Sequence, residues 1–340
     1  MRRVPRGTLA RSLAMLAAGL IALFVASGLL SEYRDLQLAD GAYYFAVLAG
    51  LTVLMGLSGQ PSLGQGALMA VGAYAVALLV HDQGWPLFPA LVVAAIATAA
   101  VGVAVGAAAS RLRGPYVAGA TLAFAVGLPP LGNRFPGTFG GENGLVINPP
   151  TPPGALGQSF PLERWQAWVA GTGALVVAFL LYNLVRSGVG RSLRAVRDDE
   201  VAASLCGLHV ARTQTLAFVV SAACAGLGGG LLVVVLQLAQ PSAFGVQLSF
   251  LLLSGAVIGG LGSLWGALWG SILLVELPNW TNDLAHSFSL SQNVSANLPA
   301  AVYGVMLIAA MLAWPSGIQG GVRSLLRLLR GALERRGAMR

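Results

Sequence analysis

The chain has 340 residues, of which 56% are hydrophobic and only 9% are charged, and its formal net charge is +8. Soluble domains carry about 25% charged residues, so this composition excludes a soluble protein and indicates a multi-pass membrane protein. Every basic residue is an arginine. Without lysine, the chain can form neither a phosphate-binding loop of the G-x-x-x-x-G-K-[ST] type nor a lysine Schiff base.

Long stretches without charged residues predict the membrane-spanning helices, at about 20 residues for each pass. The predicted spans, in chain order, are 12–31, two within 41–81, 88–110, 115–132, 165–185, three within 213–275, and 298–314. The predicted fold class is therefore all-α, a polytopic membrane protein of about ten transmembrane helices in a single domain, 1–340. An arrangement of eight spans with a re-entrant hairpin at 247–277 remains open. No ionisable side chain is expected deep inside a span.

The distribution of arginine predicts the orientation of the chain. With an even number of spans, all but three of the twenty arginines fall on the same side of the membrane as both termini; Arg34, Arg134 and Arg164 fall on the other side. Because loops rich in arginine face the cytoplasm, we expect cytoplasmic termini, a cytoplasmic loop at 186–212 and a periplasmic loop at 133–164. The tail, 315–340, mixes arginine with leucine, which is typical of a helix lying on anionic lipid.

Two segments rich in glycine, 59–68 and 259–268, interrupt the apolar pattern at the ends of predicted spans. Unwound backbone is tolerated inside a membrane only where it lines a cavity, so paired interruptions point to a translocation path. The candidates for such a path are Gln60, Ser62 and Gln65 in the first segment and Gly259, Gly262 and Ser263 in the second. The alternative is that both segments are ordinary helix ends in which glycine permits close packing.

No catalytic, cofactor or metal site is predicted. The stretch Gly56-Leu57-Ser58-Gly59 has the G-x-S-G form of an intramembrane serine protease. That chemistry needs a histidine on a neighbouring span to accept the proton of the serine, and all three histidines fall in predicted loops. Asp283 and His286 have a spacing suitable for metal ligands, but they lie in a polar outer loop and are expected to be solvated.

Several blocks of sequence resemble the permease subunits of branched-chain amino acid ABC importers. The blocks are LSGQPSLGQGA at 57–67, Gly72-Ala73-Tyr74, RLRGPY at 111–116, GENGL at 141–145, GRSLRAVRDDE at 190–200 with Ala202, Ala203 and Gly207, Leu216-Ala217-Phe218, and GGLGSLWG at 259–266. They occur in the order of the family and are specific when taken together. One departure is Pro129-Pro130, near the end of a span where the family usually continues a helix.

The resemblance implies a transmembrane subunit of an ABC importer in the bacterial inner membrane, without catalytic activity of its own. The implied partners are separate ABC ATPase subunits, a second permease subunit, a periplasmic substrate-binding protein and membrane lipid, but no nucleic acid. The implied substrate is a small amino acid, branched-chain or other, or a related compound such as urea or an amide. An ATP-independent channel or facilitator for a small neutral solute is the alternative.

The resemblance further implies that the loop 186–212 couples the permease to the ATPase through Glu200, Ala202, Ala203 and Gly207. The residues themselves favour a short docking helix. Asp198 and Asp199 suit its N-terminus, and Gly207 suits a left-handed stop at its C-terminus. We expect Ala202, Ala203 and Leu205 to form its small apolar face. The flanking arginines face either acidic residues of the ATPase or lipid head groups.

Overall fold

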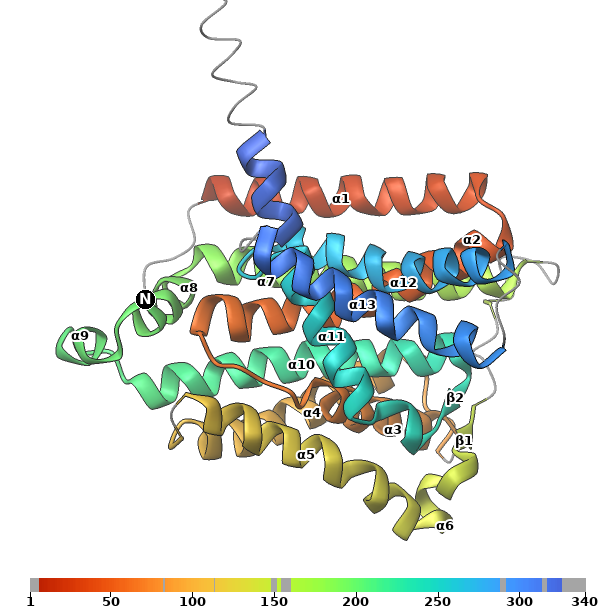
Figure 1. Ribbon diagram of the computed structural model, residues 1–340, viewed down its shortest axis with the longest axis horizontal. Coiled ribbons are helices and arrows are strands. Elements are labelled where there is room, and N and C mark those ends of the chain that lie inside the picture. The colour runs from red at the N-terminus through yellow and green to blue at the C-terminus, as the bar shows by residue number, and fades with distance from the viewer. Residues whose placement is uncertain are drawn as a thin grey trace, which may run out of the picture.

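The protein is a bundle of long helices, shown in a computed structural model that describes residues 6–81, 83–112, 114–147, 152–153, 160–287, 292–313 and 317–325 (Figure 1). The long helices are α1 (Arg6–Leu29), α2 (Glu32–Leu51), α3 (Gln65–His81), α4 (Leu87–Ala109), α5 (Pro115–Arg134), α7 (Leu162–Arg186), α10 (Val210–Leu236), α11 (Val246–Gly259), α12 (Leu264–Ser287) and α13 (Gln292–Ala313). A π-helical segment, η1 (Thr52–Leu57), continues α2 without a break. All of these helices overlap the stretches predicted as spans.

Six helical segments of the described chain are long and apolar enough to cross a membrane, and α3 and α11 are shorter apolar helices. The chain is therefore a polytopic membrane protein built from helices. The number of spans, and the choice between ten spans and eight with a hairpin, stay predictions.

Short elements gather at the two ends of the bundle. At one end, called here the α8–α9 end, α8 (Gly188–Asp198) and α9 (Glu200–Leu205) extend beyond the long helices (Figure 1). At the other end, the β1–β2 end, lie α6 (Pro136–Phe139), the 3₁₀ turns η2 (Gly141–Asn143) and η4 (Pro241–Phe244), and strands β1 (Leu145–Val146) and β2 (Leu238–Ala239). The strands pair antiparallel, with Leu145 opposite Ala239. The all-α prediction did not include this pair of short strands, which joins the segment 133–164 to the connection after α10.

The start of α2 differs from the prediction. The helix begins at Glu32 rather than near residue 41, because ion pairs accommodate the charged side chains of its first turns. Arg164 Nε of α7 lies 3.5 Å from Asp35 Oδ2, and the Asp35 side chain is fully buried. Arg34 Nη1 lies 3.5 Å from Glu276 Oε1 of α12. Asp35 lies in the first turn of α2, at the end of the helix, so the expectation that no ionisable side chain lies deep inside a span stays a prediction.

Helix α10 forms the centre of the bundle, where it packs against α2, α3, α4 and α7. Its stretch Gly228-Gly229-Gly230 and the nearby Gly226 are buried. A Cβ atom on Gly72 of α3 would lie 2.1 Å from the carbonyl oxygen of Gly226, so only glycine allows this approach. Close approach through small residues is how helices associate in lipid, where burial of apolar surface gives little driving force.

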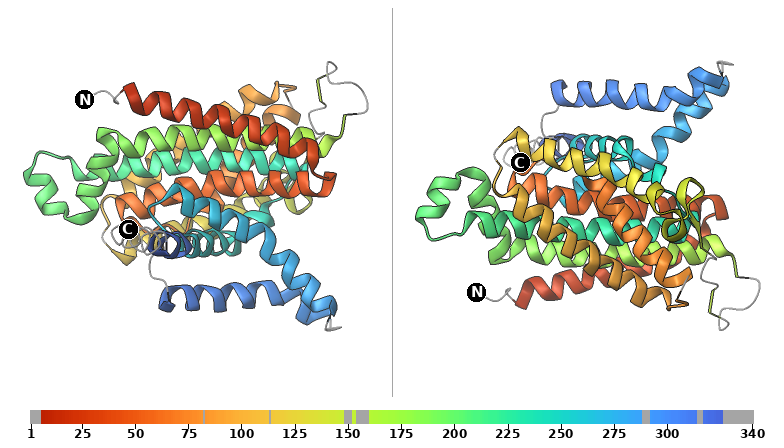
Figure 2. Two further views of the ribbon diagram at one scale, coloured as in Figure 1. Left: turned by 90° about the horizontal axis from the view of Figure 1, so that it is seen from above. Right: turned by 90° about the horizontal axis from the view of Figure 1, so that it is seen from below.

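The outer helices are held less tightly. Helix α1 packs along α7, and α13 packs mainly along the edge formed by α11 and α12 (Figure 2). Helix α5 runs through Pro129 and Pro130 to Arg134, so the two prolines do not end it.

Of the tail, residues 317–325 are described and the rest lie outside the described residues. Of the segment 133–164, residues 148–151 and 154–159 also lie outside them.

Candidate functional site

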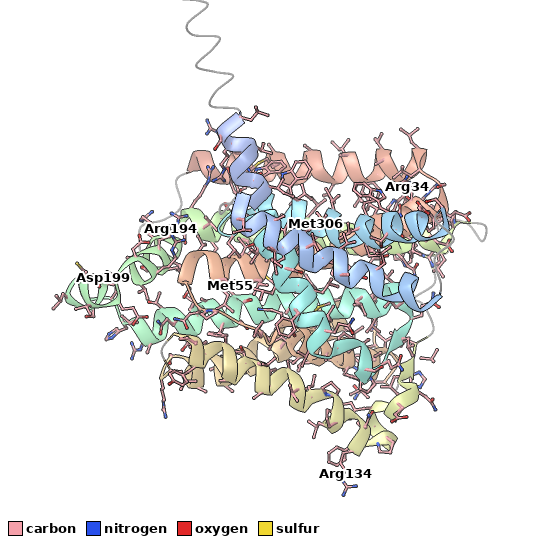
Figure 3. The ribbon with its side chains drawn as sticks, viewed as in Figure 1. Arg34, Met55, Arg134, Arg194, Asp199 and Met306 are labelled. Carbon is pink, nitrogen blue, oxygen red and sulfur yellow. The ribbon has the colours of Figure 1, made fainter. Side chains whose placement is uncertain are left out.

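The predicted docking loop 186–212 is almost entirely helical, with α8 and α9 forming a hairpin at one end of the molecule. Arg194 on α8 and Asp199 before α9 lie at this end, whereas Arg34 and Arg134 lie at the opposite one (Figure 3). Sequence reasoning predicted one helix here. It missed α8, whose Leu193 and Val196 are buried against the bundle while the arginines of α8 are exposed.

Both ends of α9 are capped by its own residues. The backbone N–H groups of Val201 and Ala202 donate to Asp199 Oδ1 at 2.8 and 3.0 Å, which satisfies two of the free donors at a helix start. Asp198, the other predicted cap, is instead the last residue of α8. Gly207 ends the helix with φ +84°, the left-handed conformation predicted for it. These caps allow six residues to hold a helix without packing on both sides.

The exposed face of α9 differs in part from the predicted one. Val201 and Leu205 are 69% and 84% exposed, and Ala202 is also exposed. Ala203, predicted on the same face, is buried against the protein, because α9 leans on α8 and the start of α10. Glu200 is held from within, since Gln214 Nε2 of α10 donates to Glu200 Oε1 at 2.7 Å. Large apolar side chains on a projecting polar loop are the usual sign of a protein contact.

The arginines of this loop are largely engaged with the protein itself. Arg194 Nη2 donates to the carbonyl oxygen of Val185, near the end of α7, at 3.0 Å. The Arg186 guanidinium lies 4.2 Å from the centre of the Tyr182 ring. Arg197 Nη1 donates to the carbonyl oxygen of Gly56 in η1. The sequence-based choice between ATPase and lipid contacts omitted these intramolecular partners.

A polar cluster surrounds the break between η1 and α3. Residues 58–64 connect η1 to α3 without regular structure beyond Ser58, and Ser58, Gln60, Ser62 and Gln65 are all buried. Hydroxyl groups on three other helices accept hydrogen bonds from this part of the chain. Thr121 of α5 accepts from Leu63 N–H at 3.0 Å, and Ser221 of α10 accepts from Gln65 Nε2 at 2.8 Å. Ser249 of α11 accepts from Gly66 N–H at 3.0 Å. Sequence reasoning missed these three hydroxyls, because an isolated Ser or Thr in a span has no distinguishing pattern.

This cluster has spare hydrogen-bonding capacity and no formal charge. The side-chain oxygens of Thr52, Ser58, Gln60 and Gln65 are buried without a partner. Buried polar atoms are nearly always satisfied in proteins, so a group of exceptions in one place points to a position for water or a ligand. Hydroxyls and amides suit a polar solute that carries no net charge.

The second glycine-interrupted segment packs against η1, just before the first. A Cβ atom on Gly56 would lie 2.2 Å from the backbone nitrogen of Gly262, so η1 packs directly on the turn between α11 and α12. Gly259 packs in the same way on Gly266 of α12. Ser263 Oγ accepts from Arg323 Nη2 at 3.0 Å. The second segment thus contacts η1 at Gly56, three residues before the first segment begins, and its Ser263 bonds to the C-terminal segment.

Among the described residues, no three His, Cys, Asp or Glu side chains come close enough to hold a metal ion. Of the two cysteines, Cys206 is exposed beside α9 and Cys224 is buried in α10. Helices long enough to span a membrane, a break near an uncharged polar cluster and a protruding helical hairpin are together typical of a membrane transport protein.

Comparison with known proteins identifies the family. The profile of the family described as "Branched-chain amino acid transport system / permease component" matches residues 37–311. The chain therefore belongs to this family, as its sequence blocks indicated, and is a permease subunit of the ABC-importer type. It is 30% identical to the high-affinity branched-chain amino acid transport system permease protein LivM of Escherichia coli K12, over 86% of this chain and 71% of LivM.

Two further relatives agree with this result. LivM of Salmonella typhimurium is 29% identical over 85% of this chain and 70% of its own length. The permease protein LivH of Escherichia coli K12 is 28% identical over 82% of this chain and 92% of its own length. No solved structure gave a significant match.

Proposed function

We propose that this chain, in the bacterial inner membrane, moves a small amino acid, most directly a branched-chain one, or a related amide. The relatives are named for branched-chain amino acid transport, which supports this choice of substrate. The path includes the uncharged cluster with Gln60, Ser62 and Gln65, and the adjoining turn with Gly259, Gly262 and Ser263. The proposed partners are ATPase subunits, a second permease subunit, identical or not, and a periplasmic binding protein.

In this proposal both termini and the loop 186–212 are cytoplasmic, the segment 133–164 is periplasmic, and the Arg-rich tail, 315–340, lies on lipid. Separate ATPase subunits supply the energy, because the chain has no lysine for a phosphate-binding loop. The docking element comprises Asp198, Asp199, Glu200, Ala202, Ala203 and Gly207. Its contact surface is the outer face of α9.

One observation carries the ATPase partner: Val201 and Leu205 stand exposed on a helix that is capped at both ends and projects from the bundle. A cytoplasmic protein with a groove for a short helix would cover both side chains. An ATP-independent channel does not require such a partner, so this surface favours the importer.

The test is Leu205→Asp in the affinity-tagged chain, expressed in its own host with its natural partners. A carboxylate in an apolar interface should lower the amount of copurified ATPase by about tenfold, because central interface residues contribute more than 1–2 kcal/mol each. Val146→Asp is the matched control, since Val146 is 64% exposed at the opposite end. It should keep the ATPase.

A wild-type chain that copurifies no ATP-hydrolysing protein, yet moves substrate in vesicles without ATP, would instead establish the ATP-independent facilitator.

A further inference from the structure

The carbonyl oxygen of Gly56 occupies an unusual position at the end of η1. In a helix it would accept from the backbone N–H four or five residues later. Here Gln60 N–H donates to Leu54 O at 3.2 Å, and residue 61 is a proline, which has no N–H. The sequence therefore leaves this carbonyl without a backbone donor at the point where the polypeptide leaves the helix.

Arg197 supplies the missing donor from a different part of the chain. Its Nη1 donates to Gly56 O across 141 residues of sequence. The stem of the side chain lies against Gly59, where an added Cβ would be 2.8 Å from Arg197 Cγ. Gly59 has φ +72°, so the backbone turns sharply around the arginine. Arg197 thus contacts both sides of the break between η1 and α3.

The position of Arg197 in its own segment is equally specific. It is the last residue but one of α8, and Asp199, two residues later, caps α9. Only Asp198 separates Arg197 from the cap of α9. On the inner side, Gly56 packs on Gly262, so the same arginine is one residue away from the second interrupted segment.

We propose that Arg197 is the positioning residue that transmits movement of the docking helix α9 to the break at Gly56–Gly59, and so to the polar cluster behind it. This inference rests on the proposed function, because it requires an ATPase that moves α9. π-helical segments such as η1 commonly occur at functional positions, and this one has a charged donor at its end. The buried Leu193 and Val196 hold α8 to the bundle independently of this bond.

The test compares Arg197→Met with Arg194→Met in the reconstituted complex with its ATPase. Arg194 is a matched control: it lies one turn earlier on α8, carries the same charge and also donates to a helix carbonyl, that of Val185. Both variants should assemble with the ATPase and hydrolyse ATP. Arg197→Met should transport at least about fivefold less substrate per ATP, the lower range of coupling between two sites, whereas Arg194→Met should match the wild type. Arg197→Lys should restore part of the ratio, since an ammonium can still donate to Gly56 O.

A second measurement follows the segment between η1 and α3. With Cys206 and Cys224 replaced by serine, Leu63→Cys reports on residues 58–64. Its reaction rate with a water-soluble maleimide should change when the ATPase is trapped with vanadate, and this change should disappear in Arg197→Met alone.

Equal transport ratios and equal maleimide responses in the two methionine variants would overturn the inference, since Arg197 would then be only an anchor. If Arg197→Met fails to accumulate, Arg197→Gln replaces it. Failure of both variants to fold, with Arg194→Met intact, would assign Arg197 a structural role and also overturn the inference. A wild-type chain that captures no ATPase is a separate result, which refutes the proposed function and the inference with it.

Discussion

Gly72 and Gly226 form one of the close contacts of α3 with α10, with backbone against backbone. Gly72→Ala places a methyl group where the carbonyl oxygen of Gly226 lies, and backbone atoms cannot move aside as a flexible side chain would. We expect the purified protein to lose about 1–3 kcal/mol of stability, the usual effect of overpacking a core. The measurement is the temperature at which the detergent-solubilised protein loses its monodisperse elution peak.

Gly119→Ala on α5 is the control, because nothing lies within 4 Å of a Cβ at that position. Alanine favours a helix over glycine by about 1 kcal/mol, so this variant should melt at the same or a higher temperature. If Gly72→Ala and Gly119→Ala lower the melting temperature equally, the α3–α10 contact is not important for stability.

At the scale of whole elements, α12 depends on α13 to complete its hydrogen bonds. Pro278 lies inside α12 and cannot donate to the carbonyl of Leu274, four residues earlier. The hydroxyl of Tyr303 on α13 donates to Leu274 O at 3.2 Å and to Leu273 O at 3.1 Å. These bonds join α13 to α12 next to Pro278.

Tyr303→Phe removes the donor and leaves the Leu274 carbonyl unsatisfied, so we expect a loss of about 1 kcal/mol in the apparent stability of the detergent-solubilised protein. In a Pro278→Ala background the alanine N–H can occupy that carbonyl, and Tyr303→Phe should then have a smaller effect. The double-mutant cycle compares the change in melting temperature that Tyr303→Phe causes with Pro278 and with Ala at position 278. A fully additive cycle would show that Tyr303 does not compensate for the proline.

For the molecule as a whole, the α8–α9 end and the β1–β2 end must face opposite sides of the membrane if the proposed orientation holds. Cys206 is a native probe at the first end, because it is exposed while Cys224 is buried. A membrane-impermeant maleimide should label Cys206 in inverted vesicles but not in intact spheroplasts. Val146→Cys, placed in a chain with Cys206→Ser, should give the opposite result. Labelling of both positions from one side would refute the predicted topology.

The positions of the long helices could be predicted from the sequence. The apolar stretches predicted where the long helices lie, and Pro61 and the neighbouring glycines predicted the break before α3. The predicted span began near residue 41, because the stretches were chosen to be free of charged residues, whereas α2 begins at Glu32. Asp35 is tolerated inside the protein only since Arg164, far along the chain, lies beside it.

For the candidate site, the features that depend on neighbours in the chain could be predicted from the sequence. Asp199 caps α9 and Gly207 ends it because both act on backbone groups within a few residues. The exposed face of α9, the hydroxyl that bonds to Gln65 and the bond from Arg197 to Gly56 instead follow from the packing of the helices. These contacts join residues 100 or more positions apart in several cases, and their formation depends on how the helices pack, for which no local pattern of residues exists.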